Sequence, residues 1–265
     1  MSNHRICSCT GRGHFDFSDM ARRLFFVPEV RRGLAELTGS DAEHLVRVLR
    51  AEPGEVHEIS DNRRAYLARI ESARKSSVVF HVMEELPPEP ARPAVHLFPA
   101  LFKFDRFEWM IEKATELGAE HIDPFSAIRS ERGLAQAAIK RVERWKKIAL
   151  EASQQCRRKR LPEIVVAKGL SEILNRELEW KLLLDEASSV PALLSILDAR
   201  HVNAGQRIGL LLGPEGGWSD QERDRIVAAG WKACSLGPTI LRAETAATAA
   251  LSVVNAACSA ALLVS

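Results

Sequence analysis

Short runs of alternating apolar and polar residues dominate residues 22–85, and such runs are typical of β-strands. Turn signals at Pro53-Gly54 and Asp61-Asn62 separate several of them. Apolar residues at helical spacing predict one helix over Asp41–Leu49, with Asp41 at its N-cap. The predicted strands are Leu24–Val27, Val56–Ser60, Tyr66–Ile70 and Ser77–Val82. We therefore expect a small β-barrel-like domain over residues 20–88.

The pattern changes after residues 87–93, whose four prolines fit neither a helix nor a central strand and predict a linker. Beyond it, buried strands alternate with amphipathic helices. The predicted strands are Val95–Leu101, Ile164–Ala167, Lys181–Asp185, Ile208–Gly213 and Ala233–Leu236. The predicted helices are Asp105–Leu117, Gly133–Cys156, Pro191–Asp198, Asp220–Ala229 and Glu244–Leu263. This alternation predicts an α/β domain with a mainly parallel sheet over residues 94–265.

Composition excludes several classes of protein. With 46% hydrophobic and 27% charged residues, the 265-residue chain is neither disordered nor collagen-like. Residues 1–19 lack apolar periodicity and the apolar stretch of a signal peptide, so we expect a disordered leader. Thr245–Ser265 is uncharged, but it is rich in small residues and contains Asn255, which favours a buried or dimer-interface helix over a membrane span.

The five cysteines are odd in number and show no CxxC spacing. We expect reduced thiols, a cytoplasmic protein and no metal site. Cys7 and Cys9 with His4 and His14 form the one combination suited to a metal, and it lies in the expected leader.

Basic charge is concentrated in residues 129–160, where eleven Lys or Arg side chains stand against three Glu. The rest of the chain is slightly acidic. A concentrated basic segment indicates a polyanionic partner, and the alternative is a solvated helix face. The apolar stripe of the predicted helix over Gly133–Cys156 leaves Lys140, Arg144 and Lys147 on another face, which suits contact with RNA.

Two loops carry candidate ligand contacts. Gly213–Gly217 follows a strand and precedes a helix start, but it is neither a Walker A loop nor a dinucleotide fingerprint, and a tight strand-to-helix turn is the alternative. In the second loop, Arg242 and Glu244 are charges in an apolar context, so each is expected to be paired or to face a ligand. Two such loops at the ends of neighbouring strands would form a ligand crevice.

A third stretch, Lys103–Gly118, predicts a helix whose start resembles a capping box of Asp105 with Glu108 and whose end is Gly118. Lys113 and Glu116 point away from its buried stripe, so they form either part of a site or a surface ion pair.

Together these motifs resemble the family of bacterial 16S ribosomal RNA (uracil-N3)-methyltransferases, within the SPOUT superfamily. The resemblance covers Arg22 to the C-terminus. It rests on His44–Arg50 with Gly54, Lys103 with Arg106, Lys113–Gly118, Arg129-Ser130, Glu151-Ala152 with Gln155, Arg158 and Pro162, Gly213–Gly217, and Ile240–Ala246.

The resemblance implies an N-terminal PUA-like barrel, a C-terminal domain with a trefoil knot, a homodimer, and methylation of N3 of a uridine in 16S ribosomal RNA, within the small ribosomal subunit. It implies S-adenosylmethionine as cofactor, held by Leu212, Gly213, Pro214, Glu215, Gly216, Gly217, Leu236, Gly237, Ile240, Leu241, Arg242 and Thr245. For the chemistry we expect Arg242 to stabilise the uracil charge, with Glu116 or Glu244 as base or orienting carboxylate.

The RNA-binding residues expected on the same basis are all basic: Arg22, Arg23, Arg47, Arg50, Lys103, Arg106, Lys113, Arg129, Lys140, Arg144, Lys147, Arg157 and Arg158. Three features depart from the family pattern: Arg157 replaces a usual glycine, Asn62 replaces the glycine of a commoner Asp-Gly turn, and residues 1–19 have no counterpart. We expect Arg157 to strengthen phosphate contact.

Three alternatives stay open at this point. A ribose 2′-O-methyltransferase shares the Arg242–Ala246 segment but not Lys113–Gly118. A non-catalytic RNA-binding assembly factor would need only the barrel and the basic segment. A nucleotide hydrolase built on the glycine loop would need a lysine and metal-binding carboxylates that the loop lacks.

Overall fold

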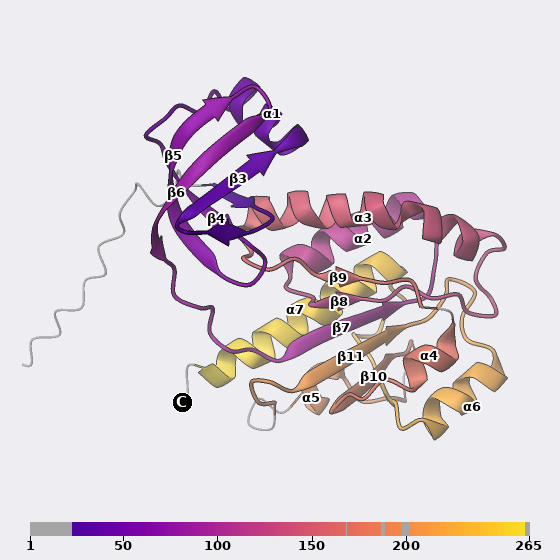
Figure 1. Cartoon of the computed structure of the whole chain (residues 1–265). Helices are drawn as coiled ribbons and strands as arrows, with labels where there is room; N and C mark the ends of the chain where they lie inside the picture. Colours follow the sequence, from indigo (N-terminus) through magenta and orange to yellow (C-terminus); the bar gives the residue numbers. More distant parts are fainter. Residues whose placement is uncertain (1–22, 168, 187–188, 198–201, 263–265) are drawn as a thin grey trace, which may run out of the picture.

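The structure is a computed structural model that describes residues 23–167, 169–186, 189–197 and 202–262. Two six-stranded sheets organise these residues, one in each half of the chain (Figure 1). Within these ranges no helix has the length and apolarity needed to cross a membrane, and no three His, Cys, Asp or Glu side chains are grouped to hold a metal ion. The predicted leader and its Cys7, Cys9, His4 and His14 lie outside the described residues.

The N-terminal unit is a curled sheet around one helix, with strand order β1-β4-β5-β6-β3-β2. Only β1 and β4 pair in parallel, and register shifts between β5 and β6 bend the sheet. Phe25, Leu37, Leu45, Ile59 and Phe80 fill its core. The elements are β1 (Leu24–Phe26), β2 (Val30–Arg31), β3 (Leu34–Thr38), α1 (Gly39–Arg47), β4 (Val56–Ser60), β5 (Ala65–Arg74) and β6 (Ser77–Glu85).

The C-terminal unit has strand order β12-β10-β11-β7-β8-β9, and every pair is parallel. The predicted α/β class with a mainly parallel sheet is therefore confirmed. The elements are β7 (Ala94–Pro99), α2 (Phe104–Glu116), β8 (His121–Ile122), α3 (Leu134–Cys156), β9 (Glu163–Ile164), α4 (Leu170–Leu174), β10 (Trp180–Leu184), α5 (Leu193–Ile196), β11 (Arg207–Leu212), α6 (Asp220–Ala228), β12 (Lys232–Cys234) and α7 (Ala243–Leu262).

Helices cover both faces of this sheet because successive strand residues point to opposite sides. On β11, Leu210 and Leu212 pack into the larger cluster with α2, α3 and α7, whereas Leu211 packs into the second cluster beneath α4 and α6. Burial on both faces explains why β11 reads as a continuous apolar run. In Figure 1, α2, α3 and α7 lie on one side of the strands and α4 and α6 on the other.

Several elements differ from the predictions. The short strands β2, β3 and β8 and the helix α4 were not predicted, and β9 shares only Ile164 with the predicted strand Ile164–Ala167. Helix α1 begins at Gly39, so Asp41 lies in its first turn and not at the N-cap. The predicted helix over Pro191–Asp198 is a single turn, α5, and its predicted last residue lies outside the described ranges, as does Leu263 after α7.

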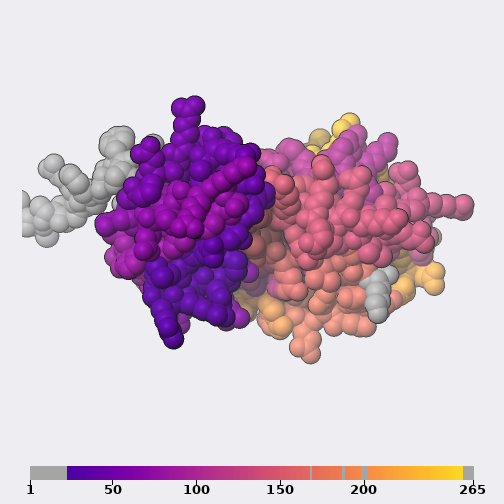
Figure 2. All heavy atoms as spheres, turned by 45° about the horizontal axis from the view of Figure 1, so that its top comes forward, coloured from indigo at the N-terminus to yellow at the C-terminus, as the bar shows by residue number. Residues whose placement is uncertain are grey.

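The two units meet where the chain leaves α3. Ser60 Oγ donates to the Lys159 carbonyl at 2.7 Å, and the Leu161 N–H donates to Asn62 Oδ1 at 2.7 Å. Arg157 forms an ion pair with Glu58 of β4. Figure 2 shows the N-terminal unit, in indigo to purple, lying directly against the pink surface of the C-terminal unit. We call this set of contacts the junction.

A stacked histidine pair lies on neighbouring strands of the C-terminal sheet. The rings of His96 on β7 and His121 on β8 are 4.2 Å apart between centroids, with 15° between their planes. Burial lowers the pKa of His96 to about 4, and the charges of His121, Arg176 and Arg207 add to the decrease against an opposing effect of Glu179. The structure therefore holds His96 neutral.

The depressed pKa makes stability dependent on pH. Because the unfolded chain takes up a proton near the usual histidine pKa of about 6.5, the folded state loses stability as the pH falls from there toward 4. Replacing His96→Phe should reduce the loss in unfolding free energy between pH 7 and pH 5, measured by urea titration at each pH. His81→Gln, at an exposed position on β6, is the control, and an unchanged pH slope in His96→Phe would contradict the assignment.

Candidate functional site

The carboxyl ends of four parallel strands lie level at one edge of the C-terminal sheet. Leu184 at the end of β10 is in register with Leu212 of β11 and with Cys234 of β12, and Leu212 is in register with Pro99 of β7. The glycine loop and the Arg242 loop therefore start at the same edge. The expectation that their strands are neighbours is wrong, because β10 lies between β11 and β12 and separates them by two strand spacings, about 10 Å.

The glycine loop makes two close approaches that a side chain would block. A Cβ on Gly213 would lie 2.7 Å from Trp218 Nε1, and one on Gly216 would lie 3.2 Å from Arg129 Cβ. Gly217 has a φ of +70°, which favours glycine, and its N–H donates to the Pro214 carbonyl at 2.8 Å. The glycines therefore bring bare backbone against Trp218 and Arg129.

The helix after this loop begins with a capping box. Ser219 Oγ accepts from the Glu222 N–H, and Glu222 Oε2 accepts from the Ser219 N–H. The other oxygen of Glu222 accepts from the Ile128 N–H at 2.8 Å. This buried carboxylate thus holds the loop to the segment that carries Arg129. The capping box predicted for Asp105 and Glu108 is wrong: α2 has no side-chain cap, and Glu108 pairs with Arg141 and Arg144.

Arg106 connects the two loops. Its Nη1 lies 3.1 Å from Glu215 Oε1 in the glycine loop, and its Nε lies 3.9 Å from Glu244 Oε1 at the start of α7. Glu244 is only 9% exposed, and its Oε2 has no hydrogen-bond partner in the described part of the chain. An unbonded buried carboxylate oxygen is costly, so a donor from a ligand would stabilise it. Glu244 was expected to be paired or to face a ligand, and its Oε1 is paired with Arg106.

The second loop is open to solvent. Arg242 and Thr245 are exposed, and no ion pair joins the Arg242 side chain to another described residue. Ile240 is 82% exposed, which is unusual for a large apolar side chain. Ser235 Oγ accepts from the Gly237 N–H at 3.1 Å and fixes the turn after β12. This loop therefore presents a cation and an apolar side chain to a partner.

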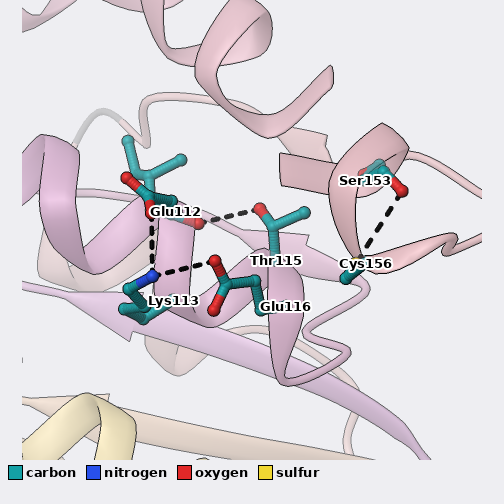
Figure 3. A network of polar contacts seen from close by, with 7 residues as sticks. Glu112, Lys113, Thr115, Glu116, Ser153 and Cys156 are labelled. Carbon is teal, nitrogen blue, oxygen red and sulfur yellow. Dashed lines mark hydrogen bonds and ion pairs between the residues drawn. The ribbon is translucent and has the colours of Figure 1, made fainter. Parts of the chain in front are cut away.

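Glu116 lies away from these loops. It is at the last turn of α2, ten residues and about 15 Å along the helix from Arg106. Figure 3 shows Lys113 between Glu112 and Glu116, and each ion pair measures 2.8 Å. These carboxylates raise the pKa of Lys113. The structure brings Arg106, Glu215 and Glu244 together and leaves Glu116 in a local ion-pair cluster.

Many of the expected RNA-binding cations have partners inside the protein. Arg144 pairs with Glu108 at 2.8 Å, Lys147 lies 3.9 Å from Glu151, and Arg47 lies 3.9 Å from Glu43. Arg129 is exposed but donates to the Gly216 carbonyl at 3.3 Å. The remaining exposed positions are Arg23, Arg50, Lys103 and Lys140, and Arg22 lies outside the described residues.

Both departures from the family pattern that lie in the described chain are at the junction. Arg157 ends α3 with a φ of +60°, and Asn62 has a φ of +66°, so each position needs the conformation that glycine adopts easily. The guanidinium of Arg157 pairs with Glu58, and therefore this arginine joins the two units instead of adding a free cation for phosphate. Arg158 donates to the Thr115 carbonyl at 3.1 Å and closes the end of α2.

Sequence reasoning missed the roles of four residues that shape the site. Arg106 was assigned to RNA contact, not to the link between the loops. Trp218 and the dual role of Glu222 were not identified, although Trp218 next to a glycine run and Ser219 three residues before Glu222 were visible signals. Asp185, buried at the end of β10, pairs with Arg223 of α6 and was also missed.

The close approach of Gly213 to Trp218 can be tested by substitution. Gly213→Ala should destabilise the protein by about 1–3 kcal/mol, because the new methyl overlaps the indole. In a Trp218→Phe background, Gly213→Ala should cost less unfolding free energy than it does in the wild-type background, since the smaller phenyl ring reduces the overlap. Chemical denaturation of all four proteins gives the coupling free energy, and a coupling of zero would contradict this packing.

Comparison with known proteins agrees with this architecture. Residues 88–255 match the family described as an RNA methyltransferase domain, and residues 37–83 match the RNA methyltransferase PUA domain. The ribosomal RNA small subunit methyltransferase E of Bacillus subtilis is 34% identical over 83% of this chain and 88% of its own length. The protein of the same name from Synechocystis is 33% identical over 89% and 78%.

Solved structures show the same fold over nearly the whole chain. The methyltransferase E from Neisseria gonorrhoeae, bound to S-adenosyl methionine, has a TM-score of 0.78 and 28% identity and covers 89% of this chain and 97% of its own. A putative methyltransferase from Legionella pneumophila, in complex with the same cofactor, has a TM-score of 0.78 and 30% identity over 89% and 98%. The chain, with its PUA and SPOUT methyltransferase units, belongs to the ribosomal RNA small subunit methyltransferase E family.

Proposed function

We propose that this protein transfers a methyl group from S-adenosylmethionine to N3 of a uridine in 16S ribosomal RNA of the small subunit. The observation that carries the proposal is the meeting of the glycine loop and the Arg242 loop at one sheet edge, linked by Arg106 beside the buried carboxylate of Glu244. The names of the relatives give the substrate, ribosomal RNA of the small subunit, and two related structures hold the cofactor.

Close packing fixes the shape of the glycine loop. Gly213 and Gly216 lack the Cβ that would clash with Trp218 or crowd Arg129, so the loop backbone is held against these two side chains. We propose that the cofactor is held by Leu212 to Gly217 on one side and by Leu236, Gly237, Ile240, Leu241, Arg242 and Thr245 on the other. When bound, the sulfonium supplies an activated methyl group.

The protein must remove the N3 proton, align N3 with the methyl group and exclude water. N3 lies on the Watson–Crick edge, so the uridine enters unpaired or flipped. We propose that Glu244 accepts the N3 proton through its unbonded Oε2, while Arg106 holds the other oxygen. Arg242 then stabilises the negative charge on the uracil, and the N3 lone pair forms the new bond as the thioether leaves. Glu116 is too far along α2 to share this role within one chain.

The RNA surface follows from the exposed cations. We propose contact through Arg23, Arg50, Lys103, Arg129 and Lys140, with Arg22 outside the described residues.

We also propose 20–88 and 94–265 as the limits of the two domains, since β6 ends at Glu85 and β7 begins at Ala94. Because the substrate is ribosomal RNA, we place the enzyme in the cytoplasm.

Single-turnover methylation of unmodified small subunits distinguishes Glu244 from Glu116 as the base. Glu244→Gln and Arg242→Gln should lower the transfer rate by about 10²–10³-fold, since each removes a group that acts on the reacting base. Glu116→Gln and its neighbour Glu112→Gln should stay within a few-fold of wild type. Nucleoside analysis must show N3-methyluridine. A larger loss in Glu116→Gln than in Glu244→Gln would reverse the assignment, and 2′-O-methylation would identify the ribose enzyme.

We propose a homodimer whose interface includes Ile240, because this exposed apolar side chain lies in the loop that also carries Arg242. Ile240→Asp should shift the protein toward monomer in sedimentation velocity and lower the methylation rate. Val227→Asp, at an apolar position 62% exposed on α6, is the matched control. A wild-type protein that sediments as a monomer at micromolar concentration would contradict the proposal.

A further inference from the structure

A large cavity lies where the two units and their linker meet. Its volume is about 1320 Å³, and its walls come from 62–65 and 85–93 on one side, from 156–165 after α3, and from Val254, Asn255 and Cys258 of α7. We call it the junction cavity. It also contacts Val95 at the start of β7 and Glu163 of β9, so it opens at the amino ends of the parallel strands. The cofactor loops lie at the opposite edge, and the two sites are therefore separate.

The junction cavity is strongly basic. Eight Lys or Arg side chains line it against five Glu. The side chains of Arg63, Arg92 and Arg160 form neither an ion pair nor a hydrogen bond with any described residue. The list of expected RNA-binding residues contains none of these three arginines, although Arg160 is the last residue of the basic segment 129–160. Uncompensated cations around one hollow raise the local concentration of an anionic ligand.

Arg158 adds a cation at the inner wall of the cavity. It is partly buried, and the one hydrogen bond of its side chain within the described chain goes to the Thr115 carbonyl, so no carboxylate is paired with it. Burial lowers its pKa, against the weaker opposing charges of Glu120 and Glu89. A guanidinium has five N–H donors, and a partly buried one without an anion is costly. The remaining donors are suited to a phosphate.

The rest of the lining indicates which part of a nucleic acid would bind. None of the described lining residues is Phe, Tyr or Trp, and the one ring besides the prolines is that of His121. Binding of bases usually relies on stacking against aromatic side chains. Proteins that bind duplex RNA contact about 16 base pairs, far more than a cavity of this size can hold. Cations without stacking surfaces therefore favour the phosphodiester backbone of a single strand.

We infer that the junction cavity binds the phosphate backbone of a single-stranded segment of the substrate RNA and so anchors the substrate at a distance from the cofactor loops. The inference rests on the proposed function in that the substrate is RNA. It assigns the contact to Arg63, Arg92, Arg158 and Arg160, and not to Arg141 and Arg144, which both pair with Glu108.

The test compares two triple variants of equal charge. Arg63→Gln/Arg92→Gln/Arg160→Gln removes the unpaired cations of the cavity. Arg74→Gln/Lys75→Gln/Lys232→Gln removes three exposed cations elsewhere: Arg74 and Lys75 are at the far end of the β5–β6 hairpin, opposite the Tyr66–Glu85 end that leads to the linker, and Lys232 is on β12. Both variants lower the net charge by three, so general electrostatic attraction changes equally.

Binding of a fluorescent ten-residue oligouridylate is measured by anisotropy at several KCl concentrations. The cavity variant should bind at least tenfold more weakly than the control variant at low salt. The slope of log K against log salt should also fall by about two, because each phosphate contact contributes roughly 0.7 for a single strand. Equal affinities and slopes for the two variants would overturn the inference.

Two further measurements separate this inference from the proposed function. Photocrosslinking of a 4-thiouridine oligomer should label peptides from 62–65, 85–93 or 156–165, and labels confined to other segments would overturn the inference. Calorimetry should show equal S-adenosylmethionine affinity in wild type and cavity variant. If wild type binds RNA through the cavity but methylates no nucleoside, the proposed function fails and the anchor stands. Full methylation with unchanged RNA affinity in the cavity variant would overturn the anchor and leave the proposed function intact.

Discussion

The level register of the parallel strands is the constraint on which the proposed active site depends. Backbone hydrogen bonds across β10 align the ends of β11 and β12, so two loops more than twenty residues apart in sequence emerge at one edge. A shift of either strand by one residue would reverse which side chains face each core, because strand periodicity is two. The buried leucines of β11 thereby fix the place of the glycine loop, and Arg106 then connects that loop to Glu244.

The cations of the protein fall into two groups with different roles. Arg106, Arg144 and Arg157 hold elements together through Glu215, Glu108 and Glu58, and their charges are largely compensated inside the protein. Arg63, Arg92 and Arg160 have no such partners among the described residues and surround a hollow. The distinction matters because an internally paired arginine must break an ion pair before it can bind phosphate, whereas an unpaired one loses only water.

Periodicity predicted the long elements well, because helices such as α3 and strands such as β11 carry strong patterns over many residues. It missed β8, whose two residues are too few for any period, and the β2–β3 hairpin, whose turn depends on positive φ at Arg32 and Gly33. Strand order was also beyond reach: nothing local to β11 or β12 shows that β10 lies between them. The implied knot came from the resemblance alone, since threading leaves no local pattern.

In the candidate site too, the sequence predicted local features but not which residues lie close together in space. The glycines and the charges of the Arg242 loop were recognisable from residue type and context. Glu116 was an equal candidate to Glu244 because sequence spacing gives no distance between the two ends of α2 and the loops. The pairing of Glu108 with Arg144, thirty-six residues away, was likewise invisible, and so the sequence made the basic face of α3 look more open than it is.

The junction has a thermodynamic consequence for substrate binding. Asn62 and Arg157 have positive φ angles that glycine would adopt easily. Glycine has no side chain, however, and could not make the contacts of Asn62 with Leu161 and of Arg157 with Glu58. Glycine at both positions would leave the two units with more orientational freedom, and RNA spanning them would have to order them on binding. Here that entropy is lost during folding, so the RNA meets a preorganised surface and retains more of its interaction energy as affinity.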